Sequence, residues 1–272
     1  MPVSGRTIPI ASVSDPAIRA YANVRDRDLT RAREGGVFVA EGENVVRVLC
    51  GRGRFVVQSL FLSERRVAAM QDVIDALPET IPVYVAPQSV MDAIIGFPIH
   101  RGVLALGERG PVVDPASLLA GVPEGLVVGL VGLTNHDNVG GIFRNAAAFR
   151  VRAILHDAAT CDPLYRKAVR VSVGGALIVP FARAETPEAM LEALESAGYQ
   201  LLGLTPGGSE TLADVPPSPR RALLFGTEGD GLPESILKRV HRVRIPMADT
   251  IDSLNVSVAS GVALYEITRP AS

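Results

Sequence analysis

Three stretches in the second half of the chain decide the fold: TNHDNVGGIFRNAA (residues 134–147), FGTEGDGL (225–232) and IPMADTIDSLNVSVASG (245–261). Each lies at the end of an apolar, strand-like run, is rich in glycine or small polar residues, and leads towards a helical pattern. Parallel strands present their carboxyl ends at one edge of a sheet, and open α/β sheets bind ligands there. Together the three stretches predict one binding site at that edge.

The polar residues of these stretches each have a local interpretation. Asn138 is placed to cap a helix whose two glycines allow close backbone approach, and Arg144 lies about two turns further on. Glu228 is the acid at the centre of a loop shaped by three glycines. Ser253 is placed to begin a closing helix with a small face that must press against other backbone: Ser257, Ala259, Ser260 and Gly261. Each feature alone is typical of a cap or turn, whereas three in one domain indicate a site.

Strand and helix patterns alternate along the whole chain, which predicts an α/β fold. In the second half, strands are expected at 126–133, 152–156, 199–205, 221–226 and 243–247, and helices at 139–150, 187–198, from 233 and at 253–268. In the first half, strands are expected at 55–62, 81–86 and 102–107, and helices at 44–50, 66–77 and 88–96. The later strands are apolar on both faces, as covered parallel strands are. A Gly- and Pro-dense stretch predicts a small domain at 1–106, a linker at 107–125 and a larger domain at 126–272.

Composition is that of a globular protein. The 272 residues include 47% hydrophobic residues, and Lys+Arg 27 against Asp+Glu 29 gives a net charge of −2, which offers no simple argument for nucleic-acid binding. Two segments are locally basic, 19–54 and 144–170, and a solvated face is the alternative explanation for each. The longest apolar run is too short to span a bilayer, and the first fifteen residues lack the apolar stretch of a secretory signal. A cytoplasmic protein without membrane contact is therefore expected.

Several common chemistries lack their motifs. The sequence has no GxxxxGK[ST] phosphate loop, no GxSxG, no HExxH, and no GxGxxG after a first strand. Its two cysteines, Cys50 and Cys161, are far apart and form no CxxC, and its four histidines are scattered. We therefore expect no metal site.

The three stretches match the motifs of a known family. N-x-G-x-x-x-R is present as Asn138 to Arg144, G-x-E-x-x-G as Gly226 to Gly231, and I-P-M followed by S-L-N-V-S as Ile245–Met247 and Ser253–Ser257. In these motifs, their order and their spacing, the sequence resembles the SpoU/TrmH family of RNA ribose 2′-O-methyltransferases of the SPOUT superfamily. The resemblance covers residues 126–268. More loosely, FVAEGENVVRVL (38–49) resembles the L30e-type substrate-binding domain of many members.

The resemblance implies a fold, a cofactor and partners. The larger domain would be a SPOUT α/β domain with a parallel sheet and a deep trefoil knot, an exception to the rule that chains do not thread loops. The smaller domain would be an L30e-like module that binds RNA. S-adenosyl-L-methionine would lie in the knot, held mainly by backbone at Thr205, Gly226, Gly229, Ile245, Met247 and Leu254. The substrate would be structured RNA, rRNA rather than tRNA, and the protein would be a homodimer through the first-motif helix and the closing helix.

The family also implies the residues around the reacting hydroxyl: Arg144, Asn138, Glu228, Ser253 and Asn255. A guanidinium keeps its proton above a pKa of about 12, so we interpret Arg144 as a positioning group whose rotamer Glu228 and Asn138 fix. His136 and Asp137 depart from the usual Asp-Pro of the family, and Arg150 stands where a Gly is common. Two alternatives stay open: a non-catalytic RNA-binding protein on the same fold, and a nucleotide-dependent α/β enzyme of another class.

Overall fold

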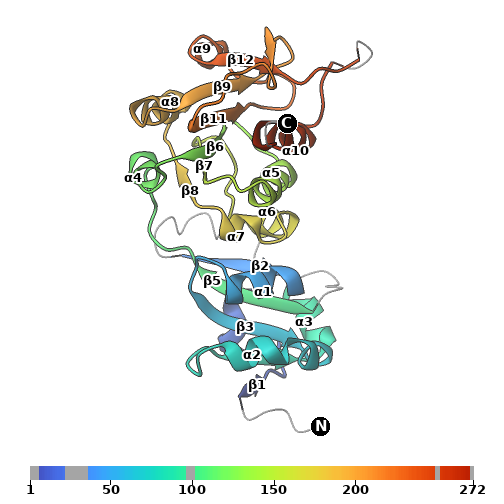
Figure 1. Ribbon diagram of the computed structural model, residues 1–272. Helices are drawn as coiled ribbons and strands as arrows, with labels where there is room; N and C mark the ends of the chain where they lie inside the picture. The colour runs from blue at the N-terminus through green and yellow to red at the C-terminus, as the bar shows by residue number, and fades with distance from the viewer. Residues whose placement is uncertain (1–5, 22–35, 96–101, 249–251, 270–272) are drawn as a thin grey trace. The chain divides into compact units, whose positions relative to one another are not determined.

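The computed structural model describes residues 6–21, 36–95, 102–248 and 252–269, and Figure 1 traces them. The chain divides into two compact units. Unit 1 comprises Met1–Pro111 and Leu164–Ile178, and unit 2 comprises Val112–Pro163 and Val179–Ser272. The segment 107–125, expected as a linker, holds a capped helix, and the excursion at 164–178 had no signal in the sequence.

Unit 1 is built on a five-stranded mixed sheet in the order β1-β4-β3-β5-β2. β1, β4 and β3 pair in parallel, whereas β5 runs antiparallel to both β3 and β2. The strands are β1 Thr7–Pro9, β2 Val37–Glu41, β3 Val57–Ser63, β4 Val83–Ala86 and β5 Val103–Glu108. The helices are η1 Pro16–Tyr21, α1 Glu43–Gly51, η2 Glu64–Arg66, η3 Ala68–Met70, α2 Gln71–Ala76, α3 Gln88–Ile95, α6 Arg166–Val171 and α7 Gly175–Ile178. The single helix expected at 66–77 is thus three short ones.

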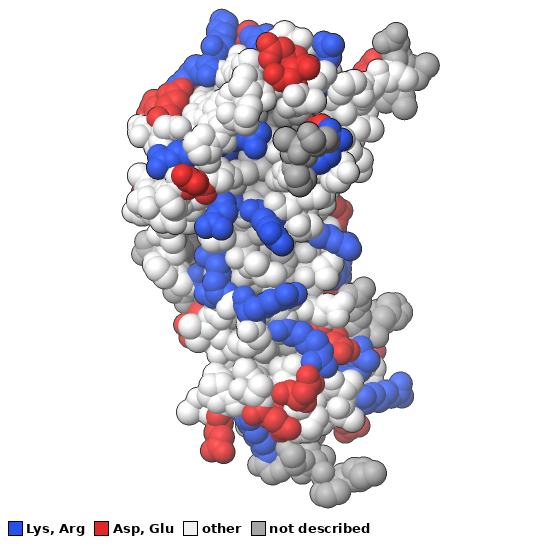
Figure 2. Space-filling model, viewed as in Figure 1, with Lys and Arg blue, Asp and Glu red and all other residues white. Residues whose placement is uncertain are grey.

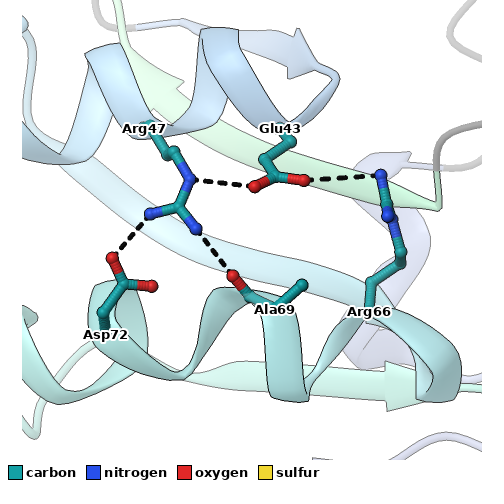
Figure 3. A network of polar contacts seen from close by, with 5 residues as sticks. All are labelled: Glu43, Arg47, Arg66, Ala69 and Asp72. Atoms are coloured by element: carbon teal, nitrogen blue, oxygen red, sulfur yellow. Dashed lines mark hydrogen bonds and ion pairs between the residues drawn. The ribbon is translucent and has the colours of Figure 1, made fainter.

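A polar network holds α1 to the short helices after β3, as Figure 3 shows. Arg47 donates through Nε to Glu43 Oε1 (3.1 Å), through Nη1 to Asp72 Oδ2 (2.6 Å) and through Nη2 to the Ala69 carbonyl (2.6 Å). Arg66 lies 3.4 Å from the other Glu43 oxygen. The hydrogen bond from Arg47 lowers the pKa of Asp72. Arg47 was counted in the basic segment 19–54, and here its charge is matched by acids of the same unit.

The excursion 164–178 joins unit 1 through a buried acid and close backbone packing. Glu41 is 5% exposed, and its carboxylate lies 3.3 Å from Arg170 and 3.7 Å from Arg166. A side chain at Gly174, which has φ +85, would collide with Val48 of α1. Burying a carboxylate is costly unless cations and donors accompany it. The arginines of α6 therefore explain why this part of the later sequence packs on β2.

Unit 2 is built on a seven-stranded sheet in the order β10-β12-β9-β11-β6-β7-β8, with every pairing parallel. Within this unit, α5 and α10 pack together on one side, and α4 and α8 pack together on the other (Figure 1). The strands are β6 Gly125–Leu130, β7 Ala153–His156, β8 Phe181–Arg183, β9 Gln200–Leu204, β10 Glu210–Thr211, β11 Arg220–Phe225 and β12 His241–Arg244. The helices are α4 Pro115–Ala120, α5 His136–Ala148, α8 Pro187–Ser196, α9 Glu234–Leu237 and α10 Val256–Thr268. The parallel α/β sheet predicted from the apolar runs is confirmed.

Two helix starts differ from the sequence prediction. Asn138 does not cap α5: the cap is Asn135, whose side chain accepts from the Asp137 N–H (2.9 Å). Ser253 does not begin α10, which starts at Val256 with Asn255 as its cap. In both places two side chains could serve as caps, and the true cap is the one whose oxygen reaches the N2 or N3 amide. His136 and Asp137, the departures from the family pattern, are the first two residues of α5.

The small face of α10 packs against α5 inside the same chain. A Cβ at Gly141 would overlap the Ser257 hydroxyl, so α5 can lie this close only with glycine there. Asn145 Nδ2 donates to the Ser257 carbonyl (2.8 Å) and to Ser260 Oγ (2.9 Å). These small residues had been taken to permit a dimer contact. That reasoning was wrong, because α5 of the same chain occupies their surface.

Candidate active site

The described part of the chain forms a cavity of about 290 Å³ at the carboxyl ends of the strands of unit 2. Its walls are the loops that follow β9, β11 and β12, together with the start of α10. The lining residues are Leu204, Thr205, Pro206, Phe225, Gly226, Thr227, Glu228, Gly229, Gly231, Ile245, Met247, Ser253, Leu254, Asn255, Val256 and Ala259. All six residues predicted for the cofactor lie in this set, as do three of the five predicted around the hydroxyl.

Much of the cavity wall is backbone, and glycines make that possible. A Cβ at Gly226 would collide with the carbonyl group of Gly231, which lies directly across the loop. Thr227 and Gly231 exchange two backbone hydrogen bonds of 3.1 Å, and Gly229 and Gly231 have φ of +96 and +70. The loop is thus a tight closed turn that a residue with a side chain could not form at these positions. Its amide and carbonyl groups can approach a ligand directly.

A polar triad stands at the rim of the cavity. Asn138 Nδ2 donates to Glu228 Oε1 (2.6 Å), and Asn255 Nδ2 donates to the same oxygen (2.7 Å) and to Asn138 Oδ1 (3.0 Å). Asn138 is only 4% exposed, whereas Glu228 and Asn255 are exposed. Three elements far apart in the sequence, α5, the β11 loop and the start of α10, are joined here. Within the described residues only Oε1 receives these bonds, which leaves Oε2 to accept from a ligand.

Arg144 lies on α5 outside this triad. Its side chain is exposed and has no hydrogen bond or ion pair with any residue that the structure describes. The expectation that Glu228 and Asn138 fix its rotamer is therefore wrong, because those two side chains bond to each other and to Asn255. Ser253 borders the cavity before α10 begins.

Sequence reasoning missed the residues that hold these elements together. Asn145 fastens α10 to α5 by the two bonds described above, and it lies seven residues after Asn138, on the same helix face. That heptad spacing of two asparagines was the available signal. Asn135 was the other omission, since three candidate caps stand side by side in Asn-His-Asp.

Metal and membrane searches cover the described residues. They contain no group of three or more His, Cys, Asp or Glu side chains placed to hold a metal ion. No helix among them is long and apolar enough to cross a bilayer. Burial raises the pKa of the Cys161 thiol to about 12 and lowers the pKa of His156, so neither is charged at neutral pH.

The fold and the cavity define an α/β protein that takes a ligand at the carboxyl edge of a parallel sheet, between backbone loops. A family model described as the SpoU rRNA Methylase family matches residues 125–265. The chain belongs to this family, which confirms the membership that the three motifs predicted.

Similar proteins agree with that assignment. An uncharacterized tRNA/rRNA methyltransferase of Mycobacterium bovis is 43% identical over 237 residues, covering 85% of this chain and 80% of the relative. The crystal structure of an AdoMet-bound rRNA methyltransferase from Sinorhizobium meliloti is 27% identical, with a TM-score of 0.77, covering 97% of this chain and 98% of the other. The crystal structure of an RNA 2′-O ribose methyltransferase, 24% identical with a TM-score of 0.74, shares the fold over 96% of this chain and 98% of its own.

Proposed function

We propose that this protein transfers the methyl group of S-adenosylmethionine to a ribose 2′-hydroxyl of structured RNA, rRNA rather than tRNA. The observation that carries the proposal is the cavity of backbone loops with the Asn138–Glu228–Asn255 triad at its rim. Family membership supports the methyl transfer, and the AdoMet-bound relative supports the cofactor. The choice of the 2′-hydroxyl rests on the motif resemblance, and the choice of rRNA rests on analogy with the family.

The cavity suits S-adenosylmethionine in shape and chemistry. Backbone donors and acceptors around Gly226 can bind an adenine edge, which no side chain screens, and Leu254 and Ile245 offer apolar contact. The bound cofactor supplies an activated methyl group on a sulfonium. The protein must then hold the ribose oxygen in line with that group, which is catalysis by positioning.

We assign the positioning to the triad and to Arg144. Two amide donors orient the Glu228 carboxylate, so that Oε2 can accept a hydrogen bond from the ribose. Arg144 retains its proton at any physiological pH, and its planar fork can bind a phosphate and the oxyanion that develops as methyl transfer proceeds. The hydroxyl proton leaves to water. No metal is assigned a role.

Basic side chains support an RNA partner. Figure 2 shows Lys and Arg side chains gathered over α6 and α7, with few acidic side chains beside them. Three of the six residues of α6 are cationic: Arg166, Lys167 and Arg170. The basic segment 144–170 is divided between the units, since these three belong to unit 1 and Arg144, Arg150 and Arg152 belong to unit 2. We propose that the first unit, expected to be L30e-like, supplies RNA affinity.

We also propose a homodimer through α10, now on a different face. Val258, Val262 and Tyr265 follow helical spacing and are 55%, 43% and 55% exposed. An exposed apolar stripe of this kind marks a protein interface. Sedimentation of the wild type and of Val262→Glu tests it: the charge should convert the dimer to monomer, and a wild-type monomer with full activity would contradict it.

The function is tested with tritiated S-adenosylmethionine and total RNA. Labelled RNA should yield an alkali-resistant dinucleotide, since a 2′-O-methyl group removes the hydroxyl that alkaline cleavage needs, and mapping should place it in rRNA. A label found in base-methylated nucleosides would overturn the 2′-O proposal. RNA binding without any transfer would favour the non-catalytic alternative. Binding of a nucleoside triphosphate instead of S-adenosylmethionine would favour the nucleotide-dependent enzyme.

A further inference from the structure

Asp157, just beyond the end of β7, is a buried acid to which the proposed reaction gives no role. It is 3% exposed, yet its carboxylate is rich in hydrogen bonds. The Gly132 N–H lies 3.1 Å from each of its two oxygens, and Oδ1 also accepts from the Thr160 N–H (2.8 Å) and from Thr160 Oγ1 (2.6 Å). Its backbone N–H donates to the Leu130 carbonyl (3.1 Å). The acid is thus built into the turn that follows β6.

Thr160 extends this hold by one residue. Its Oγ1 accepts from the Leu133 N–H (3.1 Å), and the next residue, Cys161, donates its N–H to the Leu133 carbonyl (2.8 Å). The turn 130–133 is therefore fixed along its length by 157–161. Only a carboxylate suits the centre of this arrangement, because an amide in its place would aim an N–H at the Gly132 N–H or the Thr160 N–H.

The turn that Asp157 holds lies close to two motifs at once. Along the chain it leads directly to Asn135, the cap of α5, and one turn later to Asn138. In space it abuts the β11 loop, since Gly132 has φ +68 and a Cβ there would come within 2.8 Å of Thr227 Cγ2. Thr227 precedes Glu228. Gly132 therefore sits where the first motif and the second motif meet.

We propose that Asp157 and Thr160 are positioning residues for methyl transfer. By fixing the turn 130–133 they set the start of α5, and with it the register of Asn138 against Glu228 and the direction of Arg144. Neither residue lines the cavity, so neither contacts the cofactor in its wall. This inference rests on the proposed function, because it assigns the two residues to the RNA side of that site.

The two hypotheses, positioning and mere support of the fold, predict different kinetics. Asp157→Asn and Thr160→Val remove the hold, and Thr160→Ser keeps the hydroxyl. Tyr199→Phe is the matched control: it removes a buried hydroxyl of unit 2 that donates to the Val122 carbonyl (3.0 Å) but contacts neither motif. All variants are assayed well below their Tm, for kcat and KM with RNA and for the Kd of S-adenosylhomocysteine.

Positioning predicts that Asp157→Asn and Thr160→Val lower kcat at least tenfold and leave the Kd within threefold of wild type. Thr160→Ser should stay within twofold in kcat, and Tyr199→Phe should lose thermal stability without losing kcat. The inference is overturned if Asp157→Asn and Thr160→Val keep wild-type kcat, or if cofactor affinity falls as steeply as kcat. Should Asp157→Asn fail to fold, Thr160→Val carries the test. A wild type that transfers no methyl group would instead refute the proposed function itself.

Discussion

Replacing Arg150 by glycine should stabilise the protein, although it removes a side chain. The helix α5 ends in a Schellman motif: Arg150 has φ +57, and the next N–H, of Val151, donates to the Ala146 carbonyl (2.9 Å). α8 ends the same way with Gly198 at φ +75. The left-handed conformation costs a residue with a Cβ about 1–2 kcal/mol. Arg150 bears this cost at a position where relatives often have Gly.

The expected gain follows from two opposing effects. Glycine relieves the left-handed strain, but its greater freedom in the unfolded chain offsets roughly 0.5–1 kcal/mol. Because Arg150 is exposed, little packing is lost. The free energy of unfolding should therefore rise by about 0.5–1 kcal/mol, which corresponds to an increase in Tm of roughly 1–4 °C for a domain of this size.

Urea unfolding of three variants measures the effect and separates it from loss of the side chain. Arg150→Ala removes the guanidinium but keeps the Cβ, so its stability should match the wild type. Gly198→Ala should lose about 0.5–1 kcal/mol, since the nearest atom to the new Cβ is 3.6 Å away and only the backbone conformation is penalised. Equal stability of the Gly and Ala variants at position 150 would refute the reasoning.

Three further predictions concern function and pH. Arg144→Ala should abolish methyl transfer and leave cofactor affinity within a few-fold, and Arg144→Lys should also be poor because an ammonium lacks the planar fork; a fully active Lys variant would remove Arg144 from the mechanism. Burial lowers the pKa of His156, so the unfolded chain binds the extra proton and stability should fall as pH drops below about 6.5; His156→Gln should flatten that dependence in urea titrations, and an unchanged slope would contradict it. Neutralising four arginines that lie outside the described residues should weaken RNA binding and reduce its salt slope by about 0.7–0.9 per phosphate contact, whereas Arg47→Gln, whose charge is matched within unit 1, should leave the slope unchanged: Arg25, Arg27, Arg31 and Arg33.

The sequence predicted the cavity because its logic is local and periodic. Glycine-rich loops after apolar strands must meet at one edge of a parallel sheet, and Thr205, Gly226 and Met247 do line one cavity there. The α/β class and most element positions follow from the same periodicity. The strands β8 and β10 escaped notice because each is too short to show alternation.

What the sequence could not supply depends on partners that are distant along the chain. Asn135 and Asn138 are equally good caps by composition, and Glu228, ninety residues on, decides which amide is engaged elsewhere. The buried Glu41 draws 164–178 into unit 1, which no local pattern reveals. The deep trefoil knot, the L30e-like nature of unit 1 and the domain limits 1–106 and 126–272 stay predictions.

Calorimetry of S-adenosylmethionine binding tests the central claim most directly. The wild type should bind one molecule per chain, Arg144→Ala should bind it equally well, and Gly226→Ala should lose binding, because a Cβ there collides with Gly231 in the cavity wall. Circular dichroism confirms that each variant is folded. Wild-type affinity in a folded Gly226→Ala variant would show that the cofactor binds elsewhere, and the account of this site would fail.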